Sequence, residues 1–215
     1  KEITATSSGD FTYEIKDGGL TITGYTGSDS VVDIPSQING MDVAAIGEKA
    51  FADQATITSV TIPATVITLG KGAFKNCTGL KSLTINTKIM GDADTYSAYF
   101  RDFASSESAV FYNAGSASGF TVTFGDEVTQ IPKYLFATGV ASSHCRVSKI
   151  ILGKKVKKID VCAFYYCTSL KEIEGGEALT TLEENAFAHT GFEKYPKLPA
   201  LTTIGKYAYL GCEAL

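Results

Sequence analysis

The sequence has no tryptophan, only two histidines and no long apolar run. No apolar segment approaches the roughly 20 residues of a membrane-spanning helix, so no transmembrane segment is predicted. Acidic residues outnumber basic ones by 23 to 19. The resulting net charge of −4 argues against a nucleic-acid partner, because nucleic acids favour a basic surface. Abundant Thr, Ser and Gly without Trp suit an exposed β protein.

Motifs for catalysis and metal binding are also missing. The stretch Ser142-Ser143-His144 lacks the G-x-S-x-G elbow that would support a hydrolase. No C-x-x-C pair supports a zinc site. The acidic pairs Asp92/Asp94 and Asp126/Glu127 lack the 12-residue loop that binds calcium in an EF-hand. We therefore expect no enzyme activity, no metal and no cofactor.

A five-residue step from an aliphatic residue to an aromatic one recurs along the chain. It runs from Ile46 to Phe51, and 23 residues later from Leu69 to Phe74. Further copies run from Ile131 to Phe136, Ile159 to Phe164, Leu182 to Phe187 and Ile204 to Tyr209. A fixed period in this range predicts a solenoid, in which each unit buries its apolar face against its neighbours.

The second half of each unit has the pattern L-x-x-L-x-L, as in Leu80-Lys81-Ser82-Leu83-Thr84-Ile85. This pattern predicts a short strand whose side chains point alternately in and out. Stacking of such strands predicts one parallel sheet, and the aliphatic-to-aromatic halves would form the opposite wall. The column of aromatic rings would then fill the core between successive coils.

Three of the five cysteines occupy one position of the repeat. Cys77, Cys167 and Cys212 each lie eight residues after the aliphatic residue that opens the step. A small, weakly polar residue stacked inside the coil explains this spacing better than disulfide pairing does, because free Cys is among the most buried residue types. A disulfide between Cys145 and Cys162 is the alternative, since sequence does not establish the required geometry.

The units resemble the BspA-like, Treponema-type (LRR_5) class of leucine-rich repeats, written L-x-x-I-x-I-P…L-x-x-I-G-x-x-A-F-x-x-C, over roughly residues 30–215. The resemblance implies a mainly β, right-handed solenoid with short helical or 3-10 turns and a parallel concave sheet. It also implies a secreted or surface-attached bacterial protein that acts by adhesion to host or bacterial partners. It brings no catalytic residues.

The chain divides into a predicted N-terminal β-hairpin cap, residues 1–29, and a solenoid, residues 30–215. The hairpin follows from alternation in Phe11–Ile15 and Leu20–Thr23 around an Asp-Gly-Gly turn. The solenoid is one continuous elongated domain of about six to seven units with an incomplete last unit. Gly211–Leu215 stops where the next L-x-x-L-x-L should begin, so we expect either that the chain is an excised piece of a longer protein or that more repeats follow. The chain also starts without Met, which fits removal of a signal peptide or trimming.

Residues 86–106 are predicted to be an insertion, because the aromatic spacing breaks there. The segments Phe111–Gly115 and Phe120–Phe124 then form a degenerate unit. Aromatic residues within the insertion fall at helical spacing: Tyr96, Tyr99, Phe100 and Phe103. They predict either a short amphipathic helix on the binding side or rings that cover the core where the repeat is broken.

Outward-facing residues of the predicted sheet are the candidate ligand-binding site. If Leu83 and Ile85 point inward, Ser82 and Thr84 point outward. The same register gives an outer stripe of Val31, Asp33, Ser59, Thr61, Ser82, Thr84, Thr121, Thr123, Lys149, Ile151, Glu172, Glu174 and Lys194. The ten residues from Ser59 to Glu174 are the candidate contacts. The first part of the stripe is rich in hydroxyl groups, and the later part carries Lys and Glu.

The leading hypothesis is a secreted or cell-surface, adhesin-like binding module without turnover. Its partner would be a host matrix protein, a bacterial surface protein or a glycan, and the chain would be a monomer. The alternative is a structural spacer or stalk within a larger surface protein. An exposed aromatic or apolar cluster on the outer stripe would favour binding. A uniform Ser/Thr/Lys/Glu surface would favour the spacer.

Overall fold

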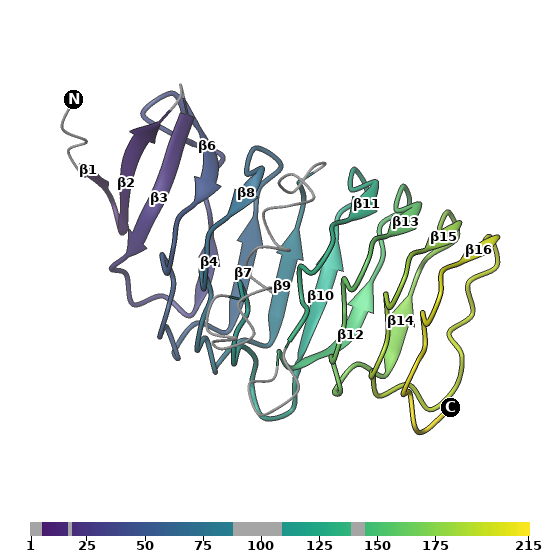
Figure 1. The fold of residues 1–215 in the computed structure, drawn as a ribbon. Helices are drawn as coiled ribbons and strands as arrows, with labels where there is room; N and C mark the ends of the chain where they lie inside the picture. The colour runs from purple at the N-terminus through teal and green to yellow at the C-terminus, as the bar shows by residue number, and fades with distance from the viewer. Residues whose placement is uncertain (1–5, 17–18, 88–108, 139–144) are drawn as a thin grey trace.

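The computed structural model describes residues 6–16, 19–87, 109–138 and 145–215. In these ranges the chain winds into stacked coils of β-strands and turns, and the first and last strands, β1 and β16, lie at opposite ends of an elongated structure (Figure 1). One sheet runs along the coils and is parallel throughout. We call it the long sheet. Its strands are β4 (Val31–Asp33), β7 (Ser59–Ile62), β9 (Ser82–Ile85), β10 (Phe120–Phe124), β12 (Val147–Ile151) and β14 (Glu172–Glu174).

The opposite wall is built from short strands that contain the aliphatic residue of each step. The strands β11 (Gln130–Ile131), β13 (Lys158–Ile159), β15 (Thr181–Leu182) and β16 (Thr203–Ile204) form one parallel sheet. Nearer the N-terminus, β8 (Thr68–Leu69) pairs with β6 (Met41–Ile46), to which β5 (Gln37–Ile38) is antiparallel. The two predicted walls of the coil are therefore confirmed.

The N-terminal strands extend this opposite wall rather than the long sheet. β1 (Thr6–Ser8), β2 (Phe11–Lys16) and β3 (Gly19–Tyr25) are antiparallel to one another, and β3 pairs with β6 in parallel. The Tyr25 ring stacks on Phe51 of the first coil at 5.6 Å between centroids. The predicted hairpin therefore covers the first aromatic ring of the solenoid. The division of the chain at residue 29 stays a prediction.

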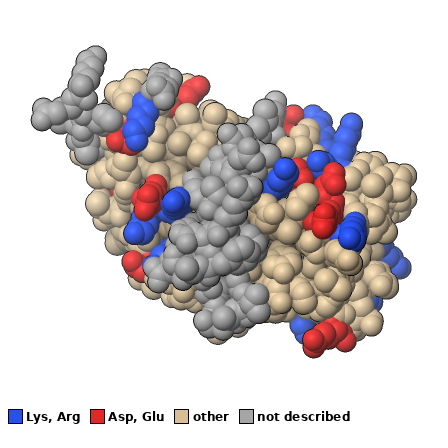
Figure 2. Space-filling model, viewed as in Figure 1, with Lys and Arg blue, Asp and Glu red and all other residues tan. Residues whose placement is uncertain are grey.

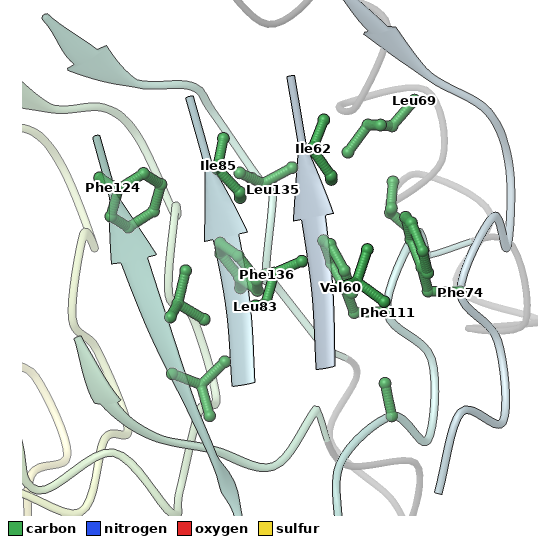
Figure 3. Packing of buried hydrophobic residues seen from close by; sticks show 14 of the residues in the cluster. Val60, Ile62, Leu69, Phe74, Leu83, Ile85, Phe111, Phe124, Leu135 and Phe136 are labelled. Carbon is green, nitrogen blue, oxygen red and sulfur yellow. The ribbon is translucent and has the colours of Figure 1, made fainter. Parts of the chain in front are cut away.

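A continuous column of aromatic rings fills the core. Successive ring centroids along Phe51, Phe74, Phe111, Phe136, Phe164, Phe187 and Tyr209 are 5.1, 5.3, 4.8, 5.3, 5.5 and 5.7 Å apart. Inward residues of the long sheet, such as Val60 and Leu83, pack near this column (Figure 3). Phe111 and β10 take their places in the stack, so the predicted degenerate unit is a true coil.

The residues that link each short strand of the opposite wall to the aromatic residue of the same step do not form helices. The Phe51 N–H donates to the Ala73 carbonyl of the next coil at 2.8 Å, and the Phe164 N–H donates to Ala186 at 3.0 Å. Residues with positive φ, such as Lys49 at 55°, interrupt any helical run. A helix would keep these hydrogen bonds within its own segment. The helical or 3-10 turns expected from the sequence are thus non-helical turns throughout the described ranges.

Several predicted features lie outside the described residues. Apart from Asn86 and Thr87, the described part of the chain includes none of the insertion predicted at 86–106. The same holds for the Ser142-Ser143-His144 stretch and the Asp92/Asp94 pair.

The cysteine column lies inside the coil, as predicted. Each thiol donates to the backbone carbonyl of the aromatic residue in the preceding coil. The three distances are 3.1 Å from Cys77 Sγ to Phe51 O, 3.3 Å from Cys167 Sγ to Phe136 O and 3.2 Å from Cys212 Sγ to Phe187 O. These bonds satisfy carbonyl groups that have been removed from water.

No disulfide joins Cys145 to Cys162. All five cysteines are free and buried. Cys145 lies beside Cys167, one coil away, and Cys162 lies beside Tyr134. The alternative pairing left open by the sequence is therefore absent.

Alkaline pH is expected to destabilise the fold through Cys77. Burial raises the pKa of this thiol to about 12, from 9.0 in the unfolded chain. Above the unfolded pKa the unfolded state loses a proton that the folded state keeps, so the free energy of unfolding falls by about 1.4 kcal/mol per pH unit until the folded pKa is reached. Between pH 8 and 10.5 the free energy of unfolding of the unaltered chain should fall by about 2 kcal/mol more than that of Cys77→Thr. Urea unfolding at the two pH values measures the difference.

Cys77→Thr is a suitable variant because Thr190, at the same repeat position, is also buried and donates to a backbone carbonyl, that of Phe187 in its own coil. Both proteins share every other alkaline titration, so the difference isolates Cys77. Equal losses of stability in the two proteins would contradict the expected effect.

Candidate functional site

The outward side chains of the long sheet form two columns across its strands. Ser59 pairs in register with Val31 and Ser82, and Thr61 pairs with Asp33 and Thr84. The columns continue through Thr121, Lys149 and Glu172, and through Thr123, Ile151 and Glu174. The predicted register is therefore present, and it brings all ten candidate residues onto one surface.

Hydroxyl groups in the first part of these columns make no hydrogen bond within the described ranges. None of the six hydroxyls bonds to another residue of that part of the chain. They belong to Ser59, Thr61, Ser82, Thr84, Thr121 and Thr123, all of which are half-buried. A hydroxyl can both donate and accept hydrogen bonds.

Neighbouring hydroxyls outside the two columns behave differently. Thr58 donates to the Ser30 carbonyl at 3.0 Å, and Thr180 donates to the Lys157 carbonyl at 3.1 Å. Each of these bonds joins one coil to the preceding coil. The described ranges thus contain structural hydroxyls between coils, and sheet hydroxyls that bond to no other described residue.

The later part of the columns is charged and internally compensated. Lys149 forms ion pairs with both Glu172, at 3.6 Å, and Glu174. The hydrogen bond to Glu174, followed by the charge of Glu172, raises the pKa of the Lys149 ammonium. These three side chains therefore mainly satisfy one another, unlike the hydroxyl groups of the first part.

Lys194 is not part of the columns, although the sequence placed it there. The segment 191–198 has no strand and makes no backbone hydrogen bond to β14. Pro196 lies within this segment, and its ring nitrogen has no N–H to donate. The long sheet therefore ends at β14.

The departure of this segment leaves a groove at the end of the long sheet. It has a volume of about 360 Å³ and is lined by Lys171, Glu172, Ile173, Phe192, Lys194, Tyr195, Pro196 and Lys197. The repeat pattern did not predict the exposed Tyr195, because the period implies a regular strand at this position. The Tyr-Pro pair at the strand position was the signal that could have revealed it.

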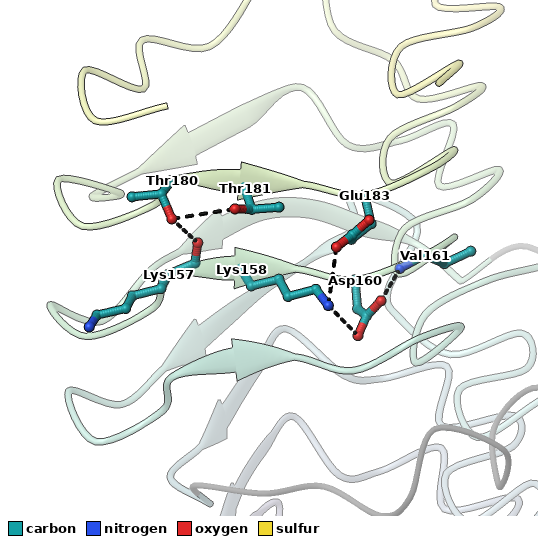
Figure 4. Close-up of polar contacts among 7 residues, drawn as sticks. All are labelled: Lys157, Lys158, Asp160, Val161, Thr180, Thr181 and Glu183. Carbon is teal, nitrogen blue, oxygen red and sulfur yellow. Dashed lines mark hydrogen bonds and ion pairs between the residues drawn. The ribbon is translucent and has the colours of Figure 1, made fainter. Parts of the chain in front are cut away.

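Ion pairs on the opposite wall are structural. Lys158 lies 3.3 Å from Asp160 and 3.1 Å from Glu183, and the Val161 N–H donates to Asp160 at 2.8 Å (Figure 4). The buried Asp160 carboxylate is thus compensated on both oxygens. Such an arrangement holds adjacent coils together and leaves no isolated carboxylate for acid–base chemistry.

Other charged groups are likewise intermixed. The second acidic pair considered for calcium, Asp126/Glu127, forms ion pairs with lysines. The distances are 3.1 Å from Asp126 to Lys154 and 2.6 Å from Glu127 to Lys155. On the face shown in Figure 2, lysine and arginine lie beside acidic residues rather than in separate areas. Nowhere in the described ranges do three or more His, Cys, Asp or Glu gather to hold a metal ion.

His189 packs against an aromatic ring. Its ring stacks on Tyr166 at 4.2 Å between centroids, in a turn beside the aromatic column. A hollow of about 450 Å³ borders these rings, and Glu213 is its one acidic lining residue. No described cysteine or serine joins His189 there in a nucleophile–base arrangement.

Stacked coils with a parallel sheet on one side and an aromatic column inside define a leucine-rich repeat solenoid, a fold that generally serves as a non-catalytic binding scaffold. The BspA type leucine rich repeat region matches residues 44–142 and 129–215 in six copies. The chain therefore belongs to this family. None of the described residues forms a helix long and apolar enough to cross a bilayer.

Two solved structures show the same fold. A leucine rich cell surface protein of Faecalibacterium prausnitzii A2-165 is 24% identical, with a TM-score of 0.52 over 100% of this chain. The match covers 54% of that protein, so this chain spans about half of its length. The leucine rich repeat protein of T. pallidum is 22% identical, with a TM-score of 0.57 over 99% of this chain and 91% of that one. No curated protein matches the chain.

Proposed function

We propose that this chain is a non-catalytic binding module, secreted or displayed on the bacterial cell surface, that contacts a protein or glycan through the long sheet. The observation that carries the proposal is the set of six sheet hydroxyls that make no hydrogen bond to any residue of the described ranges. The family and the cell-surface description of the Faecalibacterium protein support the location. The module acts as a monomer.

Binding would take place by polar contact over a regular surface. Ser59, Ser82 and Thr121 lie in one column, and Thr61, Thr84 and Thr123 lie in the other. Neighbouring strands are about 4.8 Å apart, so each column presents evenly spaced donors and acceptors. The threonine methyl groups add apolar contact. Such a surface suits the hydroxyl and amide groups of a glycan or of an extended protein segment.

Replacing Thr61, Thr84 and Thr123 together by glutamate tests the proposal. The three new carboxylates remove the hydroxyls and repel one another across the column. Capture of partners from host-matrix and bacterial-surface extracts should fall about tenfold or more. The measurement is a pull-down with the immobilised chain, quantified by mass spectrometry.

A matched control carries the same added charge elsewhere. Thr56, Thr78 and Thr129 are exposed and lie outside the long sheet. Their triple replacement by glutamate should leave capture and thermal melting unchanged. Capture that is equal for the sheet variant and the control variant would exclude the long sheet as the binding face.

A structural spacer is the second candidate. The outward columns contain no aromatic residue, and their apolar members, Val31 and Ile151, lie on different strands. This lack of an apolar cluster favours a spacer. If the unaltered chain captures nothing from either extract, the spacer is supported and the binding module is rejected.

A further inference from the structure

The free edge of β14 is a feature that a solenoid does not require. β14 pairs with β12 on one side, and the next coil offers no strand on the other side. That coil is otherwise intact, because Phe192 is buried against Phe187 at 5.4 Å and β15 pairs with β16. The coil therefore departs from the sheet only at the segment next to β14.

Such an edge presents backbone N–H and C=O groups without strand partners. In folded proteins these groups are a template for pairing with another strand. The 360 Å³ groove borders this edge, and its lining includes the apolar residues Ile173 and Phe192. An extended peptide can occupy a groove of this kind, with its backbone on the edge and alternate side chains in the groove.

The charges around the groove select the kind of peptide. Lys171 is paired with Glu193 at 2.6 Å, and Glu172 is paired with Lys149 at 3.6 Å. Lys194 and Lys197 also lie at the groove. Neither of them forms an ion pair with a carboxylate of the described chain. Lys171 mainly, and Lys194 to a smaller extent, lower the pKa of Glu193. Lysines that line the groove still outnumber its one lining glutamate by three to one, and this excess favours an acidic partner.

Tyr195 supplies the aromatic contact that the outward columns lack. Its side chain is 67% exposed, the largest exposure among the large hydrophobic residues of the described ranges. Its ring lies edge-on to Tyr209 at 5.3 Å and 88°, which holds it upright beside the groove. Exposed, rigid tyrosines are frequent anchors at protein interfaces.

We infer that this groove binds an extended acidic peptide segment of a partner protein, which adds as a strand to β14. Its carboxylates contact Lys194 and Lys197, and an apolar side chain contacts Tyr195. This site lies at the edge of the long sheet, so it is separate from the hydroxyl face of the proposed function.

The test uses the full 215-residue chain and a short fluorescent peptide that alternates valine with aspartate. Fluorescence anisotropy should show binding that weakens at high salt. The double variant Lys194→Glu with Lys197→Glu should bind about tenfold more weakly. Two further peptides carry N-methyl groups on either the odd or the even backbone nitrogens. One of the two should bind more weakly, because its methyl groups remove the N–H donors that face the strand edge.

The control double variant, Lys157→Glu with Lys206→Glu, makes the same change of net charge away from the groove. It should bind the peptide like the unaltered chain. Equal binding by both double variants, or equal binding of a valine–lysine peptide, would overturn the proposal. So would unaltered binding of both methylated peptides, which would indicate an anion site without strand addition.

Two other occupants are distinguished by the same variants. Binding of a sulfated oligosaccharide, but not of the peptide, with loss in Lys194→Glu/Lys197→Glu would replace the peptide by an acidic glycan. Self-association that this variant abolishes, seen by sedimentation velocity without peptide binding, would replace it by a second copy of the chain. The glutamate variants of the hydroxyl face should bind the peptide normally, so the two proposals fail independently.

Discussion

Phe164→Ala is expected to lower the free energy of unfolding by about 4 kcal/mol, because it removes a fully buried ring and leaves a cavity in the aromatic column. The Phe164 ring stacks on Phe136 at 5.3 Å and on Phe187 at 5.5 Å. Both neighbours lose a packing surface, and the interfaces with two adjacent coils weaken together. Urea unfolding followed by circular dichroism measures the change.

Two further variants test whether the loss of stability comes from the buried ring or would follow from any loss of apolar side chain. Phe164→Leu keeps most of the apolar volume and should cost about half as much as the alanine variant. Ile67→Ala removes an apolar side chain that is 51% exposed, so its effect should stay below about 1 kcal/mol. If Phe164→Ala were as mild as Ile67→Ala, the aromatic column would not be a main source of stability.

Gly79→Ala is expected to destabilise the fold by about 3 kcal/mol through a backbone collision. A Cβ atom at this position would lie 2.1 Å from the Ala55 carbonyl oxygen and 3.0 Å from that of Ile57, both in the preceding coil. Backbone carbonyls can retreat only if the two coils separate. The φ of Gly79 is not positive, so the cost arises from the close approach of the coils and not from a strained conformation.

Thr78→Ala is the control for this variant. Thr78 is the exposed neighbour of Gly79, and its replacement should change the unfolding free energy by less than about 0.5 kcal/mol. Gly191→Ala should resemble Gly79→Ala, because its Cβ would lie 2.3 Å from the Thr168 carbonyl oxygen of the preceding coil. Thermal melts of the three variants rank these effects, and a Gly79→Ala melt as high as that of Thr78→Ala would contradict the collision.

The repeat predicted the stacked coils and the outward register because both follow from local spacing. Alternation in Ser82–Ile85 fixes which side chains face the core, and neighbouring strands inherit the same register from the constant period. The interior place of Cys77 followed from the same constant period. These features depend on the positions of residues along one coil and its copies.

Other features depend on how separate segments meet in space. The sequence indicated a hairpin at the N-terminus, but its pairing with β6 on the opposite wall is a long-range choice. Which hydroxyls bond to a carbonyl, as Thr58 does, depends on the distance between coils. The loss of the strand around Lys194 reflects Pro196, a local signal that the regular period concealed.

The five thiols inside the coils have a consequence for the conditions under which the protein folds. Many extracellular domains are completed by disulfides and therefore need an oxidant. Here the thiols are free, and the stacked rings and hydrogen bonds between coils stabilise the described structure instead. We therefore expect the described structure to form without an oxidant, and reductants that would open a disulfide-stabilised domain should leave it intact.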